Sequence, residues 1–578
     1  MNGNKAGKQI GILGGGPSGL FVYKRLVESG HSDVAITIIE RKAQPGAGMP
    51  YSSEGACHEH ITNVSGNEIP DLVTSLREWV QTAPPDLLKR FGIRPENFSD
   101  YKVVPRLLLG EYLAAQFDLL EQQAKKAGIA TQWVFDTAVS DIVDDPAENK
   151  VTVITGSGSY RFDHIIICTG HQWPHHHEGT VPGWFDSPYP PAKLAMRTPY
   201  PVAIKGASLT AIDGIRTLAR HNGHFVQQDN KLVYRTDAES NGFRLVMHSL
   251  DGLLPAIRFH LEDSHLSKEA ALSEEEIKAC MAANDGFVPL DYVYEQCFKE
   301  PLRRQDPDFY EAIRHMSMEA FVDHMMSLRE RIDAFLLFRA EYAEAEQSIR
   351  RRESVHWKEM LAVLSFAMNY PAKHFCAEDM LRLKKVLMPL ISIVIAFVPQ
   401  SSCQELLALY EAGVLSLVPV DTDSEALPQP EGGALYRYTD EEGRRQSVPY
   451  KLYVDCTGQR AFEFHEVPFE RLRSDGSISP AWLRFRSADA AAAAKADGNK
   501  VKQDNMGPYY LQVPGIAIND RFQVLDRYGV YNPRIYMMAV PYIAGFNPDY
   551  SGLDFCEAAS ARIHQSLQEV MAADNASS

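Results

Sequence analysis

Residues 9–19 read QIGILGGGPSG, and this stretch decides the fold. The run 9–13 has the character of a short buried strand, and the glycine-rich run 14–19 follows it at once. An amphipathic stretch covers 20–28. A second apolar run covers 34–39 and is followed by the acid Glu40. The order strand, glycine turn, helix, strand, acid is typical of a dinucleotide-binding unit.

The three spaced glycines of this motif have separate expected roles. Gly14 permits the tight turn, Gly16 lets the backbone approach a pyrophosphate, and Gly19 lets helix and strand pack closely. Glu40 lies 21 residues after Gly19, where a carboxylate accepts hydrogen bonds from a ribose diol and disfavours a 2′-phosphate. The motif therefore predicts FAD or NAD rather than a purely structural turn. The cofactor-binding residues expected here are Gly14, Gly16, Pro17, Ser18, Gly19, Glu40 and Arg41.

Two Thr-Gly segments favour FAD over NAD. The buried strand 164–168 runs into Thr169-Gly170, and the strand 451–455 runs into Cys456-Thr457-Gly458. Each is similar to the return segment of flavoproteins with two dinucleotide-binding units, and 532–539 resembles their last FAD strand. We therefore add Thr169, Gly170, Thr457 and Gly458 to the predicted cofactor site, together with Val139 from the strand candidate 131–143.

A second strand, turn and helix begin at 201–206. Only Gly206 remains of the glycines expected there, and Ser208 stands where a second glycine is usual. Asp251, after the next strand, would repel a 2′-phosphate, although Arg235 and Arg244 flank that strand. Two interpretations stay open: a weakened nicotinamide site that prefers NADH over NADPH, or a remnant of the fold that binds no nucleotide.

Composition excludes several other classes. The 578 residues are 45% hydrophobic and 23% charged, as in folded enzymes. The net charge of −17 argues against nucleic acid as a partner. The eight cysteines form no CxxC pair, so we expect neither a disulfide reductase nor a metal site. The N-terminus has no signal-peptide pattern and the apolar run 387–398 is too short to span a bilayer, so we expect a cytoplasmic protein with no membrane partner.

The pattern predicts an α/β fold with two Rossmann-like dinucleotide-binding units, the second inserted in the first, plus a largely helical cap. The expected divisions are 1–200 for the first part of the FAD-binding domain and 201–263 for a degenerate NAD(P)-binding-like unit. A helical, substrate-side region is expected over 264–400, and a return to the FAD-binding domain with a C-terminal helix over 401–578.

The chain resembles the bacterial FAD/NAD(P)-binding protein family that is distantly similar to flavin-dependent N-hydroxylating monooxygenases. Similar stretches are 46–52, 61–64, 76–80, 104–113, 252–255 and 412–415. The resemblance implies FAD at the first motif, Arg106 beside the cofactor or a substrate carboxylate, and oxygenation of small amino acids in some members. The chain departs from the pattern at the second glycine motif and at Val540-Pro541, where many flavoproteins have Gly-Asp.

The leading expectation is an FAD-dependent monooxygenase of a small amino-acid-like substrate, with NADH or NADPH as donor and a flavin hydroperoxide in a dry pocket. No catalytic side chain is assigned by this chemistry. For His58 and His60, ahead of the stretch expected at the flavin, both a proton-transfer role and a packing role remain open. Two alternative functions also stay open: a flavin oxidase or dehydrogenase that uses no nicotinamide, and a non-enzymatic flavin-binding partner protein. The sequence does not determine the oligomeric state.

Overall fold

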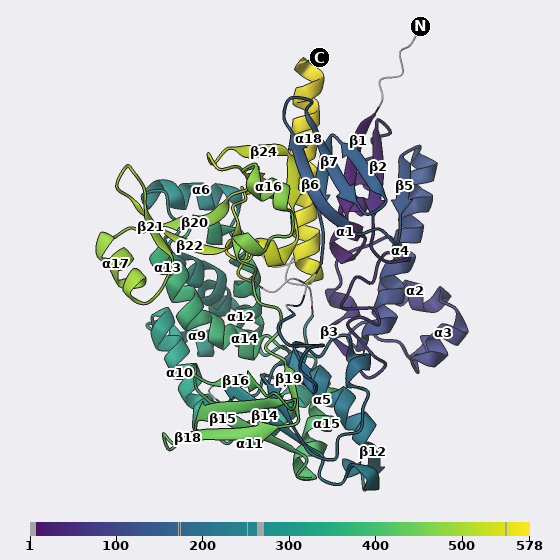
Figure 1. The fold of residues 1–578 in the computed structure, drawn as a ribbon, viewed down its shortest axis with the longest axis vertical. Helices are drawn as coiled ribbons and strands as arrows, with labels where there is room; N and C mark the ends of the chain where they lie inside the picture. Colours follow the sequence, from purple (N-terminus) through teal and green to yellow (C-terminus); the bar gives the residue numbers. More distant parts are fainter. Residues whose placement is uncertain are drawn as a thin grey trace.

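The computed structural model describes residues 7–170, 173, 175–250, 252–262, 271–549 and 552–577. Two parallel sheets, a helical region and a long C-terminal helix make up most of it (Figure 1). Among the described residues, no helix combines the length and the apolar character needed to cross a bilayer.

The first sheet contains the strand that precedes the glycine-rich turn. Its order is β23-β24-β9-β1-β2-β5. The strands are β1 (Lys8–Leu13), β2 (Val34–Ile39), β5 (Ala130–Val134), β9 (His164–Ile167), β23 (Gln523–Leu525) and β24 (Tyr531–Met537). All neighbours run parallel except β23 and β24. The last four residues of β1 and of β2 are buried, as expected of parallel strands covered on both faces.

Three helices cover this sheet. They are α1 (Pro17–Glu28), α4 (Arg106–Ala127) and α18 (Leu553–Ser577). The C-terminal helix α18 lies beside α1, where Glu557 pairs with Lys24 and Arg25 (Figure 1). Segments from the beginning and the end of the chain therefore pack together in the first unit.

The second sheet has the order β10-β19-β11-β14-β15, and all of its neighbours are parallel. Its strands are β10 (Trp184–Phe185), β11 (Pro201–Lys205), β14 (Arg244–Leu250), β15 (Leu415–Val420) and β19 (Leu452–Asp455). Helices α5 (Leu209–Asn222) and α15 (Gln400–Glu411) pack with it. Every strand of this sheet lies between β9 and β23 in the sequence.

The sheet membership differs from the expected divisions at two places. Strand β10 lies within the range 1–200 expected for the first unit, but it joins the second sheet. The range 401–578 expected for the returning FAD-binding domain also includes β15 and β19, which complete the second sheet. The Cys-Thr-Gly segment at 456 is similar to a return segment of the first unit, but it follows a strand of the second unit.

A helical region occupies 274–394, close to the expected range 264–400. Its helices are α6 (Glu274–Ala283), α7 (Leu290–Tyr294), α8 (Glu300–Gln305), α9 (Pro307–Ile313), α10 (Met318–Glu330), α11 (Ala334–Arg351), α12 (His356–Ala367), α13 (Ala377–Arg382) and α14 (Met388–Val394). Buried Leu364 and Leu390 share the hydrophobic core of the first unit, whereas Phe335 and Phe338 of α11 join that of the second. The region therefore packs against both units.

Smaller elements complete the fold. The two-stranded sheets pair β3 (Ile61–Ser65) with β4 (Val103–Pro105) and β12 (Gly223–Gln228) with β13 (Lys231–Thr236). The three-stranded sheets contain β6 (Val139–Asp145), β7 (Lys150–Thr155) and β8 (Gly158–Phe162); β16 (Glu425–Pro428), β17 (Ala434–Thr439) and β18 (Arg445–Tyr450); and β20 (Pro480–Arg484), β21 (Val501–Gln503) and β22 (Tyr509–Ile516). Short helices are α2 (Leu76–Thr82), α3 (Pro85–Arg90), α16 (Glu470–Ser474) and α17 (Ala488–Ala496).

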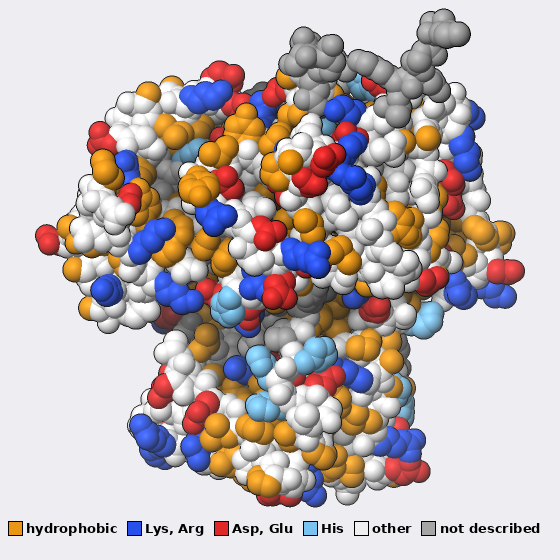
Figure 2. Space-filling model, turned by 45° about the horizontal axis from the view of Figure 1, so that its top comes forward, with side chains coloured by type: hydrophobic (Ala, Val, Ile, Leu, Met, Phe, Trp, Pro, Cys, Tyr) orange, Lys and Arg blue, Asp and Glu red, His pale blue; other side chains and the backbone are white. Residues whose placement is uncertain are grey.

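The outline narrows between a broad part and a smaller part (Figure 2). On the face drawn there, Lys and Arg side chains are interspersed with Asp and Glu. An interspersed surface of this kind differs from the clustered basic stripe of a nucleic-acid-binding face.

Candidate dinucleotide-binding sites

The glycine turn after β1 has no room for a side chain at its first glycine. Gly14 has φ +111°, and a Cβ there would lie 2.7 Å from the carbonyl oxygen of Cys168. A Cβ on Gly19 would lie 2.1 Å from the carbonyl oxygen of Gly14. Both positions therefore require glycine for the turn and for helix–strand packing, in the roles that the spacing predicts.

The N-terminus of α1 is open to a ligand. Gly16 is the N-cap residue, no side chain caps the helix, and no acid lies in its first turn. Pro17 at the first helical position has no N–H, and Leu20 donates to the Gly16 carbonyl oxygen over 3.0 Å. The first-turn amides of such a helix bind anions, so Gly16, Pro17, Ser18 and Gly19 form a suitable pyrophosphate cradle.

The distal acid is held in place beside this cradle. Glu40 is buried, and its carboxylate accepts hydrogen bonds from the backbone N–H of Gly15 (2.7 Å) and of Lys42 (2.9 Å). A carboxylate oxygen has capacity for a further donor, so a ribose hydroxyl fits the remaining positions. The donor set and the cradle therefore fit FAD.

The other predicted residues of the first unit have mixed environments. Arg41 is exposed and pairs with Glu54 over 2.7 Å, while Val139, at the start of β6, is half-buried against the first core. Thr169 and Gly170 follow β9, and Thr169 lies beside the hydroxyl of Tyr542. Burial raises the pKa of Tyr542 to about 12, and the Thr169 hydroxyl opposes this shift. Tyr542 has no sequence signal of its own, because the flavoprotein motif covers only the adjacent Val540-Pro541.

The second glycine turn repeats the geometry of the first. Gly206 has φ +105°, and a Cβ there would lie 2.8 Å from the carbonyl oxygen of Cys456. Each turn glycine donates its N–H to the neighbouring strand, Gly14 to Ile39 over 2.8 Å and Gly206 to His248 over 2.7 Å. Helix α5, like α1, begins without a side-chain cap or an acid in its first turn. Thus the second turn has the same backbone geometry as the first, although Ser208 stands where a second glycine is usual.

Thr457 and Gly458 belong to this second turn. They follow β19, which lies beside β11, so the Cys-Thr-Gly segment faces Gly206 as Cys168-Thr169-Gly170 faces Gly14. A cofactor held by Thr457 is therefore one bound by the second unit. Asp251, on which the prediction of donor preference depends, lies outside the described residues, whereas Arg244 stands at the opposite end of β14 from Leu250.

Arg106 makes a contact that the sequence did not predict. Its Nη1 donates to Asp213 of α5 over 2.5 Å, and its Nε donates to the Ile61 carbonyl oxygen over 3.2 Å. The Tyr189 hydroxyl donates to the same Asp213 oxygen over 2.6 Å. This buried pair joins α4 of the first unit to α5 of the second, and a contact of Arg106 with the cofactor or with a substrate carboxylate stays a prediction. Burial raises the pKa of Asp213, but Arg106, His60 and Tyr189 together hold it below its ordinary value.

His60 lies in the same network. Its Nδ1 accepts the N–H of Cys57 over 2.9 Å, and its Nε2 faces the Asp213 carbonyl oxygen at 3.2 Å and the Thr217 hydroxyl at 3.3 Å. The Thr217 hydroxyl donates to Glu59, so it accepts from Nε2–H. Burial and nearby Arg106 lower the pKa of His60. The imidazole is therefore neutral and fully partnered, which favours the packing role over proton transfer.

Comparison with known proteins fits this geometry. Residues 11–172 match the FAD-NAD(P)-binding family, and residues 273–395 match the YdhS-like middle domain. The chain contains an FAD/NAD(P)-binding domain of the Rossmann type, and its helical region is similar to the YdhS-like middle domain. No group of three or more His, Cys, Asp or Glu side chains suited to a metal ion occurs in the part of the chain that the structure describes.

The chain is similar to the uncharacterized protein YdhS of Escherichia coli K12. The two are 28% identical over 473 residues, which cover 81% of this chain and 86% of that one. Among solved structures, it is similar to the ornithine N-hydroxylase of Kutzneria sp. 744, with 13% identity, a TM-score of 0.45, and 98% and 100% of the chains covered. It is also similar to L-lysine 6-monooxygenase of Pseudomonas syringae, with 12% identity, a TM-score of 0.46, and 97% and 99% covered.

Proposed function

We propose that this protein is an FAD-dependent oxidoreductase that holds FAD at the first glycine turn. The observation that carries the proposal is the cradle of Gly14, Gly16 and Gly19 with the buried carboxylate of Glu40, inside a domain that matches the FAD-NAD(P)-binding family. The N-terminus of α1 would hold the pyrophosphate, and the Glu40 carboxylate would hold the ribose. Thr169 and Gly170 follow the adjacent strand β9, and the Thr169 backbone lies beside the Gly14 turn.

When bound, FAD supplies hydride and electron transfer, and the protein supplies binding, orientation and exclusion of water. Gly15 and Lys42 hold the Glu40 carboxylate in place before a ribose arrives, so little ordering is needed on binding. Arg106 and Asp213 fix the second unit against the first, which sets how a donor or substrate approaches.

The more specific proposal is a monooxygenase that acts on a small amino-acid-like substrate. Its support is the sequence resemblance to the family related to N-hydroxylating monooxygenases. The second turn supports a nicotinamide site, because Gly206 and the Cys-Thr-Gly segment keep the geometry of the first turn despite Ser208. A nicotinamide-independent oxidase or dehydrogenase remains the second candidate, since a retained turn does not require a retained ligand.

An anaerobic titration of the purified protein with NADH and with NADPH tests this function. Bleaching of the flavin spectrum by either donor is the expected result. Bleaching by small amino acids or amines alone would support the oxidase or dehydrogenase, and a flavin inert to all of them would support a non-enzymatic partner protein.

A further inference from the structure

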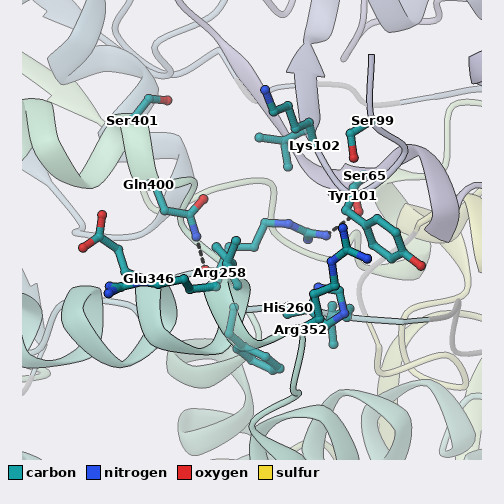
Figure 3. A pocket seen from close by; sticks show the side chains of 15 residues that line it. Ser65, Ser99, Tyr101, Lys102, Arg258, His260, Glu346, Arg352, Gln400 and Ser401 are labelled. Carbon is teal, nitrogen blue, oxygen red and sulfur yellow. Dashed lines mark hydrogen bonds between the residues drawn. The ribbon is translucent and has the colours of Figure 1, made fainter. Parts of the chain in front are cut away.

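A cavity lies away from both glycine turns. It has a volume of about 630 Å³ and lies between the β3–β4 pair, the segment 258–261, the C-terminal end of α11 and the N-terminal end of α15 (Figure 3). Its lining contains no residue of 14–19 or of 206–213. The volume is in the range that holds small molecules.

A buried arginine forms a fixed part of the wall. Arg258 is only 4% exposed and donates to the Asn63 carbonyl oxygen, to Ser65 Oγ and to Glu68. The Gln400 side chain in turn donates to the Arg258 carbonyl oxygen, as the dashed line in Figure 3 shows. The guanidinium is thus held in one orientation by the first three of these residues, with its charge matched by Glu68.

Three further cations line the cavity, and one of them, Arg352, has an anion nearby, because its charge lowers the pKa of Glu262. Lys102, Arg350 and Arg352 are exposed, and none of them forms an ion pair with any described residue. Glu346 is the one carboxylate among the lining residues. In a chain of net charge −17, this local excess of positive charge attracts anions into the cavity.

The rest of the lining has apolar surface and hydroxyl donors. Phe259, Leu261 and the half-exposed Ile349 supply apolar area, and Ser65, Ser99 and Ser401 supply hydroxyl groups. A mixture of apolar walls and a few convergent polar groups is typical of small-molecule sites.

We propose that this cavity is a second small-molecule site, which takes a compact polyanion with two or more carboxylate or phosphate groups. One anionic group pairs with Arg350 and Arg352 at the end of α11, and another lies toward Lys102 on the β3–β4 side. Since α11 also packs on the second unit through Phe338, occupation of the cavity ties the helical region to both units.

Calorimetric titration of the flavin-loaded protein with citrate and with inorganic pyrophosphate tests the proposal and separates the two anion types. The variants Arg350→Ala and Arg352→Asn each remove one cation; asparagine tolerates the φ of +56° that Arg352 adopts. Arg351→Ala is the matched control, because Arg351 is an exposed neighbour on the same helix end that does not line the cavity.

We expect at least one of the two anions to bind, with affinity about three- to fivefold weaker in each cavity variant and unchanged in the control. Binding should also weaken with added salt. Failure of both anions to bind near about 1 mM, or an equal loss in the Arg351→Ala control, would overturn the proposal. Because the readout is binding heat and the flavin content is measured separately, either result leaves the FAD assignment intact.

Discussion

At the residue scale, burial separates two arginine–carboxylate pairs of similar length. Arg106 and Asp213 are 15% and 6% exposed, whereas Arg41 and Glu54 are 53% and 44% exposed. Removing one partner of a buried pair leaves an uncompensated charge, so Arg106→Ala should lower the free energy of unfolding by about 3–5 kcal/mol. Arg41→Ala, the control, should change it by less than about 1 kcal/mol. Urea unfolding measures both, and equal losses would show that the Arg106 pair is not buried in solution. The flavin content of Arg106→Ala tests separately whether Arg106 also contacts the cofactor.

His60 gives a prediction for the pH dependence of stability. Burial holds its pKa below the ordinary 6.5, so the unfolded chain binds a proton more readily than the folded one. Stability is therefore full above pH 6.5 and falls as the pH drops below it, by at most about 1.4 kcal/mol per pH unit. Protonation of Nδ1 would also place an N–H against the N–H of Cys57.

The carboxylates near His60 affect the pH dependence of stability only at lower pH. Glu59 and Asp213 have pKa values below 4.5 and 3.8, so their contributions are lost only when the pH falls below about those values. Between pH 5 and 6.5 the slope should therefore be smaller in His60→Gln than in the exposed control His58→Gln. The remaining slope comes from His248 and His564, because burial also lowers their pKa values. Equal slopes in the two variants would show that His60 does not contribute to the pH dependence.

At the element scale, the two strand–turn–helix units differ in the acid that comes after the second strand. Glu40 directly follows β2 and is described, whereas Asp251 follows β14 and is known only from the sequence. Because Arg244 lies at the far end of β14, it cannot offset a carboxylate at the end where nucleotides bind.

We therefore expect NADH to reduce the bound flavin faster than NADPH, by about fivefold or more after solvent screening. Stopped-flow reduction with each donor measures this, and Asp251→Asn should narrow the difference. A faster reaction with NADPH would refute the charge argument, and no reaction with either donor would favour a turn that has lost its ligand.

The glycine motifs were predictable because a turn with φ above +100° and a backbone contact below 3 Å excludes other residues locally. The sheet to which β19 belongs was not predictable from the sequence. A strand of the type Leu-Tyr-Val-Asp fits either sheet, and only its pairing with β11 decides between the two sheets. The Arg106–Asp213 pair was also hidden, since the two residues are 107 positions apart and come together only when the units pack.

At the scale of the whole molecule, the first unit contains segments from both ends of the chain. The second unit lies between these segments in the sequence. The FAD-binding sheet takes β1 and β2 from the beginning and β24 from the end, with α18 against α1. The helical region packs on both cores, so its position is set by tertiary contacts that helical periodicity alone does not specify.

The central claim is that the first glycine turn binds FAD, and the flavin content of Gly16→Val tests it most directly. A Cβ at Gly16 would lie 3.3 Å from Gly48 Cα, and the valine methyl groups would enter the pyrophosphate path. Gly156→Val is the matched control, because a Cβ there has nothing within 4 Å. The account predicts stoichiometric FAD in the unmodified protein and in Gly156→Val, and colourless, folded Gly16→Val. Stoichiometric FAD in Gly16→Val would contradict it.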